Sequence, residues 1–264
     1  MRRADIVRCV SLLVALHPLL PRLGAAQMLE TETARQLGAR HLKLEAGYEL
    51  QSSSDGREHA LPLVVEYGIT NWLEIAAEPV PYNAIRPKRG RYAHGFGDLE
   101  VTLTALARHE TQRVPAVAFA AEAKLPTAKD ILIGTGRPDY AAYAIASKRV
   151  GRFDTHGNVN YTFIGSPRGV RLKNTIGAAL ATEFHATTKA SVFLEVLGST
   201  ASATEGEGDA GGAGAPVPEA AGGELVGSFG FARYAGRNAR FSLGFSFDNN
   251  AAFQLRPGFA LWFR

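Results

Sequence analysis

The sequence predicts an all-β protein, a closed antiparallel transmembrane β-barrel of about twelve strands that is preceded by a cleaved signal peptide. Three observations predict this fold. The chain opens with a leader typical of exported proteins, most of the remainder alternates apolar and polar residues, and the links between the alternating runs are short and long in turn. A length of 264 residues suits one barrel domain, which we place at residues 27–264.

The leader is predicted over residues 1–26. Three arginines in the first eight residues give it a positive start, residues 9–20 are a short apolar run, and Gly24–Ala26 supply the small residues of a cleavage site. The alternative is an N-terminal membrane anchor, but the apolar run is short for a span and contains Pro18. Cleavage after Ala26 removes four arginines and one aspartate, so the net charge falls from +4 to about +1. The mature chain is then not basic, and we expect no nucleic-acid partner.

Cleavage also removes Cys9, which is the one cysteine of the sequence. The mature chain can therefore form neither a disulfide nor a cysteine–metal site. No later stretch is apolar over about eighteen residues, so the sequence contains no candidate transmembrane helix. An exported chain of this kind crosses a membrane only as a closed barrel, since helices and closed barrels alone satisfy every backbone polar group in lipid.

The strands are predicted from alternation with a period of two. In residues 153–163, Phe153, Val159, Tyr161 and Phe163 lie on one face and polar residues fill the other. A soluble sandwich also alternates, but its strands need only about five or six residues, whereas many runs here reach roughly ten. The runs begin near positions 39, 59, 71, 96, 114, 139, 152, 170, 188, 223, 238 and 252.

The links between these runs alternate in length. Short turns are expected near residues 70–71, 109–113, 151–152, 186–188 and 235–238, and longer or more polar links at 51–58, 81–95, 126–138, 165–169, 199–222 and 248–251. This asymmetry is typical of outer-membrane barrels, which have short periplasmic turns and larger external loops. Residues 199–223 are rich in Gly and Ala and lack aromatics, so we expect a disordered external loop; the alternative is a linker between two domains.

Three segments carry a resemblance to a known family. They are GFGDLEVTLTALARHE at 95–110, AFAAEAKLPTA at 118–128, and the stretch from GTGRPDY to NVNYTFIG at 134–165. They resemble the outer-membrane β-barrel family described as "meta-pathway of phenol degradation, putative", although Ala128 and Asn160 stand where that family commonly has Gly. The resemblance runs from about residue 37 to the C-terminus. It implies an outer-membrane barrel of transporter type, associated with the degradation of aromatic compounds.

Charged and polar side chains on the inner face of the predicted barrel are the candidate site. They either line a pore that selects solutes or pair with one another and fill a narrow barrel, and both interpretations stay open. These lumen-lining candidates are Lys43, Glu45, Glu49, Glu66, Glu74, Glu78, Glu100, Glu122, Lys124, His156, Arg171, Lys173, Glu183, Glu195 and Arg240.

Aromatic residues near the predicted strand ends are expected to form interfacial girdles. They are Trp72, Tyr82, Tyr92, Phe153, Phe184, Tyr234 and Trp262. His94, His109 and His185 have no metal-ligand spacing, so no metal or other cofactor is predicted. His156 is the one histidine that a lipid-modifying enzyme could use, but its phase turns it away from lipid, and no catalytic residue is assigned.

The function expected from the sequence is passage of a small molecule, of the hydrophobic or aromatic class that the resemblance suggests, across the bacterial outer membrane. The alternatives are a structural or surface-interaction barrel that transports nothing and, third, a lipid-modifying membrane enzyme. Expected partners are outer-membrane lipid, the solute, and the barrel-assembly machinery. That machinery commonly reads a final aromatic residue, and here Phe263 is next to last.

Overall fold

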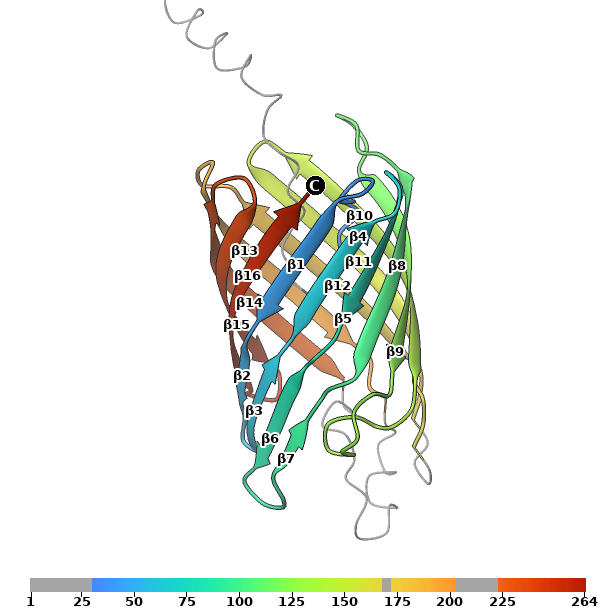
Figure 1. Cartoon of the computed structure of the whole chain (residues 1–264), viewed down its shortest axis with the longest axis vertical. Coiled ribbons are helices and arrows are strands. Elements are labelled where there is room, and N and C mark those ends of the chain that lie inside the picture. Colours follow the sequence, from blue (N-terminus) through green and yellow to red (C-terminus); the bar gives the residue numbers. More distant parts are fainter. Residues whose placement is uncertain (1–29, 168–171, 203–222) are drawn as a thin grey trace, which may run out of the picture.

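The computed structural model describes residues 30–167, 172–202 and 223–264, and shows one antiparallel sheet that closes on itself where β1 pairs with β16 (Figure 1). The predicted leader and residues 203–222 of the predicted external loop lie outside the described residues. The segments are β1 (Leu42–Gly47), β2 (Glu49–Ser52), β3 (Gly56–Leu61), β4 (Leu63–Gly68), β5 (Leu73–Glu78), β6 (Tyr82–Pro87), β7 (Ala93–Gly95), β8 (Leu99–Arg108), β9 (Ala116–Leu125), β10 (Asp139–Val150), β11 (Phe153–Phe163), β12 (Thr175–Phe184), β13 (Ala190–Ser199), β14 (Glu224–Ala235), β15 (Ala239–Asp248) and β16 (Phe253–Phe263).

The sixteen segments make twelve barrel strands, as the sequence predicts. The first eight are the halves of four long strands, each interrupted near its middle: β1 with β2, β3 with β4, β5 with β6, and β7 with β8. The predicted runs coincide with the twelve strands to within a few residues. The largest offset is at the run expected near 170, which begins at Thr175. Within the described residues, no helix has the length and hydrophobicity of a membrane span.

Prolines occupy two of the four interruptions. Pro62 separates β3 from β4, and Pro79 and Pro81 separate β5 from β6. Proline has no N–H to donate to a sheet ladder, so a strand bends or stops there. Hydrogen bonds still join neighbouring strands at the interruptions. The N–H of Gly47 donates to the Pro62 carbonyl at 3.0 Å, and the N–H of Leu63 donates to the Pro79 carbonyl at 3.0 Å. The wall therefore bends but stays joined, and β2, β3, β6 and β7 project beyond the rest of the barrel (Figure 1).

The two faces of the sheet differ as those of a membrane barrel do. Along β14, Leu225, Phe229 and Phe231 are exposed on the outer face, while Ser228 and Tyr234 are buried on the inner one. Aromatic rings continue across the outer face of neighbouring strands, with Phe229 and Phe245 stacked at 5.3 Å between ring centroids. An apolar exterior around a polar interior is the reverse of a soluble protein and fits a lipid surround.

The links are sorted by length, as predicted. One end of the barrel has the short turns and the C-terminus, and we call it the short-turn end; the other is the long-loop end (Figure 1). At the long-loop end, residues 126–138 reach β6 and β7 through an ion pair between Arg91 and Asp130. In an outer-membrane barrel the short turns are periplasmic and the longer loops external.

Two residues of the predicted aromatic girdle face inward, so that part of the prediction is wrong. Tyr234 is buried in the lumen, and Trp262 lies opposite the inward Lys43 in the β1–β16 register. Alternation decides the face of each residue, and both side chains fall on the polar phase of their strands. Trp72 and Phe153 are exposed, and the Phe184 ring packs on that of Phe153 at 5.0 Å.

Candidate functional site

The segment before β1 lies inside the barrel. Residues 30–41, which we call the N-terminal strap, run from the middle of the lumen toward the short-turn end. The strap contacts the far wall: the backbone N–H and the hydroxyl of Thr31 donate to Glu195 Oε1 at 2.8 and 2.6 Å. The N–H of Ala34 donates to Ser147 Oγ at 2.9 Å. Because the strap has no regular secondary structure, these side-chain acceptors satisfy backbone groups that would otherwise be buried without partners.

Arg35 is the electrostatic anchor of the strap. Its guanidinium makes three hydrogen bonds of 2.6–3.1 Å to the two carboxylate oxygens of Asp154 on β11. Its Nη1 lies 2.8 Å from Glu110 Oε2 in the turn between β8 and β9. Further along, the N–H of Leu37 donates to Glu74 Oε2 at 2.7 Å. A guanidinium that binds both oxygens of a carboxylate is fixed in position and in orientation. Arg35 therefore holds the strap at one defined place on the wall.

Ser147, His156 and Asp154 form a cluster under the strap that resembles a catalytic triad in composition. Ser147 Oγ lies 2.8 Å from His156 Nδ1, and His156 Nε2 lies 3.8 Å from Asp154 Oδ1. However, His156 is 1% exposed, Thr33 Oγ1 contacts the same Nδ1 at 3.1 Å, and Asp154 is engaged by Arg35. With no open space for a substrate between serine and histidine, the cluster holds the strap in place.

Many of the inner charges are paired. Lys43 Nζ lies 2.8 Å from Glu45 Oε1 and 2.6 Å from Glu66 Oε1. On β15, the Arg240 guanidinium lies 3.5 Å from the carboxylate of Glu183 on β12 and 5.4 Å from the ring centroid of Tyr234. Buried charges need such partners, because an unpaired one costs several kcal/mol. For these residues the pairing interpretation of the sequence is the one that the geometry supports.

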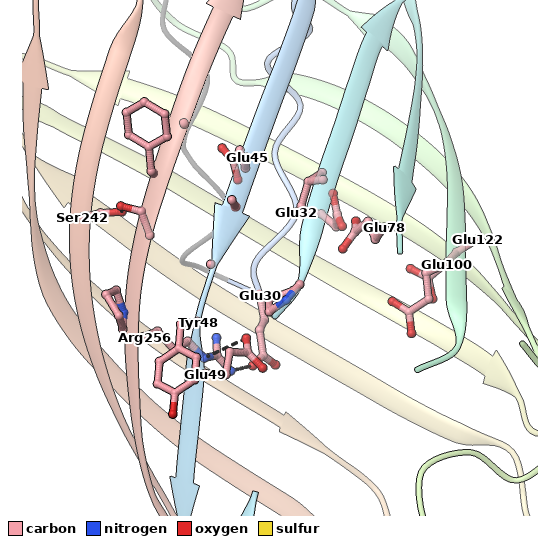
Figure 2. Close-up of a pocket in the computed structure, with 18 of the residues that line it drawn as sticks. Glu30, Glu32, Glu45, Tyr48, Glu49, Glu78, Glu100, Glu122, Ser242 and Arg256 are labelled. Carbon is pink, nitrogen blue, oxygen red and sulfur yellow. Dashed lines mark hydrogen bonds and ion pairs between the residues drawn. The ribbon is translucent and has the colours of Figure 1, made fainter. Parts of the chain in front are cut away.

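One region of the lumen has an excess of acidic side chains over basic ones. A cavity of about 440 Å³ lies between the strap and the wall at the bend of β1, β4 and β16 (Figure 2). Arg256 is the one cationic residue in its lining, and it pairs with Glu30 and Glu49. Its carboxylate-bearing residues are Glu30, Glu32, Glu45, Glu49, Glu78, Glu100 and Glu122. In the part of the chain that the structure describes, no group of His, Cys, Asp or Glu is arranged to hold a metal ion.

The structure places most of the sequence candidates on the inner face. Lys173 does not lie there: it is exposed in the link before β12, because the strand begins at Thr175 rather than near 170. Arg171 lies outside the described residues. The candidates on inward positions are Lys43, Glu45, Glu49, Glu66, Glu74, Glu78, Glu100, Glu122, Lys124, His156, Glu183, Glu195 and Arg240.

Sequence reasoning missed the strap residues and Arg256. Glu30, Glu32 and Arg35 belong to a segment without periodicity, so nothing local predicts that it enters the lumen. Arg256 had a usable pattern, since Gln254 and Arg256 alternate with the outward Phe253 and Leu255.

Comparison with known proteins agrees with this architecture. The fold is similar to that of the COG4313 outer membrane channel from Pseudomonas putida F1, with a TM-score of 0.67, 10% identity, and coverage of 87% of this chain and 98% of that one. It is also similar to the NanC porin, with a TM-score of 0.57, 11% identity, and coverage of 83% of this chain and 98% of that one. The KdgM porin gives a TM-score of 0.55 at 9% identity over 83% of this chain and 99% of that one.

At these identities the likeness concerns the fold alone. No curated protein sequence matches the chain. A family model, however, matches residues 65–264, which is well over half of the sequence. With a closed twelve-strand barrel and this match, the chain belongs to the family described as "Putative MetA-pathway of phenol degradation".

Proposed function

We propose that the chain is exported by the leader at residues 1–26 and forms a channel for small molecules across the bacterial outer membrane. The observation that carries the proposal is the carboxylate-lined cavity of about 440 Å³ inside a closed barrel with an apolar exterior. A barrel whose lumen served only to stabilise the fold would be packed with side chains, because packed interiors leave few voids larger than a water molecule. The cavity is therefore better explained by passage of a solute. The structures it resembles are named as channels and porins, which supports the same function.

The charge of the lining favours cations. Seven carboxylate-bearing residues line the cavity; two of them pair with Arg256 and Glu45 pairs with Lys43, so acidic side chains still outnumber basic ones. Rings of carboxylates are the usual selectivity element of cation-conducting pores. The family description links the family to phenol degradation, so small aromatic solutes belong among the compounds tested; among these, we expect a protonated amine to permeate better than a carboxylate of the same size.

A second candidate, a barrel that transports nothing, is favoured by one specific observation. The N-terminal strap occupies part of the lumen and is held by Glu195, Ser147 and Asp154 on the far wall. A permanently seated strap would narrow the passage, and the protein would then act through its exterior or its loops. The two candidates differ in whether solute crosses the barrel, which can be measured directly.

The test is conductance in planar lipid bilayers with the refolded mature chain. In a KCl gradient we expect discrete current steps and a reversal potential of the sign given by cation preference. Changing Glu100→Gln together with Glu122→Gln, both in the cavity lining, moves the reversal potential toward zero. Asp130→Asn is the matched control, because Asp130 is a carboxylate outside that lining. Absence of current steps, both in the full mature chain and in one that lacks residues 27–38, would establish the non-transporting barrel instead.

A further inference from the structure

A patch of basic and aromatic residues lies on the outer face of the barrel at the long-loop end, away from the lumen. It is formed by β3, β6, the link that follows and β7, which belong to the part that projects in Figure 1. Its cationic members are Arg57, Arg86, Lys88 and Arg89, all exposed, and its aromatic members are Tyr82, Tyr92 and His94. We call it the external basic patch.

The register of the sheet shows which way this patch faces. Phe253 pairs with Ser52, Ser52 with Arg57, and Arg57 with Arg86. Residues directly opposite each other in a sheet point to the same face. Phe253 belongs to the outer aromatic surface, since its ring packs 5.2 Å from that of the exposed Phe247. Arg57 and Arg86 therefore extend the lipid-facing surface of the barrel toward its external end.

Arg57 and Arg86 form a cross-strand pair of like charge. Side chains directly opposite have Cβ atoms about 5 Å apart, and like charges at that position destabilise a sheet. Within the described residues, neither guanidinium has a carboxylate within salt-bridge distance. Arg91, in the same link, differs because it is neutralised by Asp130. Among the described residues, Arg57 and Arg86 thus carry adjacent positive charges without a paired carboxylate, and a bound anion would reduce the repulsion between them.

Aromatic contacts hold one of the arginines in position. The Arg86 guanidinium lies over the ring of Tyr92 at 5.3 Å, and the hydroxyls of Tyr92 and Tyr82 are 3.3 Å apart. A guanidinium stacked on an aromatic ring keeps its edge free for hydrogen bonds. Its donors form a planar fork that matches two oxygens of a phosphate. The patch is therefore partly organised for a phosphate before any ligand arrives.

The height of the patch fits the headgroup layer of a membrane. On the outward row of β3 and β4, the last large apolar side chain is Leu61, and Arg57 lies four residues beyond it, roughly 13 Å along the strand. Tyr82 is paired with Leu61 and marks the boundary where interfacial aromatics are expected. Positive charge just outside the hydrocarbon region attracts anionic lipid headgroups.

We propose that the external basic patch binds the phosphate groups of lipopolysaccharide in the outer leaflet. The inference rests on the outer-membrane placement proposed above, but not on conduction through the lumen. Lipopolysaccharide is the occupant that the geometry favours, because the patch continues the lipid-facing surface and its arginines point where the phosphorylated sugar headgroups of that leaflet lie. A soluble anion would approach from the aqueous phase at the mouth of the barrel, whereas this face continues the surface that contacts lipid.

The test measures binding of purified lipopolysaccharide to the mature protein in detergent by native mass spectrometry. Changing Arg57→Gln and Arg86→Gln together should weaken binding at least roughly tenfold, since charge-assisted hydrogen bonds to phosphate are lost. Arg233→Gln is the matched control, because Arg233 is an exposed outward arginine near the short-turn end of β14, and it should leave binding unchanged. Enzymatically dephosphorylated lipopolysaccharide should bind the unaltered protein as weakly as the intact lipid binds the double variant.

Three results would overturn the proposal: equal binding by the double variant, equal binding of the dephosphorylated lipid, or displacement of the lipid by inorganic phosphate at equal concentration. The last would show a general anion site. Conductance recorded on the same double variant separates this inference from the proposed function, since the patch lies outside the cavity lining and the current steps should persist. A protein that binds the lipid but never conducts would uphold the patch and refute the channel.

Discussion

Replacing Arg35 by Met should release the N-terminal strap from the wall of the lumen. The change removes three hydrogen bonds to Asp154 and the ion pair to Glu110, and it leaves both carboxylates in place. Breaking a buried ion pair by removing one partner costs about 3–5 kcal/mol. The side chains of Arg35 and Glu110 are 15% and 19% exposed, so water partly replaces the lost partner and the lower limit applies. A loss of about 3 kcal/mol shifts the ratio of free to seated strap roughly 100-fold.

The shift can be measured by thiol labelling. Ala34 is 2% exposed and packs among alanines of β9, so a cysteine placed there reacts only when the strap leaves its seat. The sequence has one native cysteine, Cys9, within the predicted leader, and the mature chain then has no competing thiol. In an Ala34→Cys background, Arg35→Met should raise the rate of modification by a water-soluble maleimide roughly 100-fold. Arg91→Met is the control, because Arg91 also loses an ion pair but lies in an external link. A rate that stays within twofold of the Ala34→Cys parent would refute the view that this pair holds the strap.

Two further predictions concern the wall and the external links. Gly230→Ala should lower the unfolding temperature, measured as the loss of folded migration on semi-native gels, because its Cβ would lie 2.3 Å from Phe193 Cζ and overpacking costs about 1–3 kcal/mol. Gly227→Ala on the same strand meets nothing within 4 Å and should leave that temperature unchanged; equal effects at both positions would exclude the steric explanation. The hydrogen bond from Arg91 lowers the pKa of Asp130 to about 2. A lowered carboxyl pKa means that the link is intact at neutral pH and is lost only as the pH falls toward 2. Arg91→Ala should return the pKa toward its ordinary value, as followed by carbon-13 NMR of the carboxyl, and an unmoved pKa would contradict the assignment.

The strands were predictable from the sequence because their information is local. Alternation over ten residues identifies a strand and its two faces at once, and hence the inward Lys43, Glu122 and Glu183. The run expected near 170 started too early because Val170 and Leu172 alternate with Arg171 and Lys173 in the sequence, and Lys173 was misplaced with it. Aromatic type was a poorer guide than phase, as the inward Tyr234 shows.

The strap could not be predicted because its structure depends on distant partners. Thr31 is 164 residues from Glu195 in the sequence, and Ala34 is 113 residues from Ser147. No short-range pattern records such contacts. The acidic cavity was missed for the same reason, since two of its carboxylates, Glu30 and Glu32, are contributed by the strap. The inner charges were identified individually, but only the closed barrel shows which are paired and which converge on open space.

The attachment of the strap to β1 limits the ways in which it can form and move. Its last residue adjoins Leu42 at the short-turn end, while its hydrogen-bonding partners Ser147 and Glu195 are synthesised more than a hundred residues later. The segment can make these contacts only after the opposite wall has been synthesised, and it is enclosed by a complete cylinder only when β16 pairs with β1. Once enclosed, it is hinged at the short-turn end, where it continues into β1.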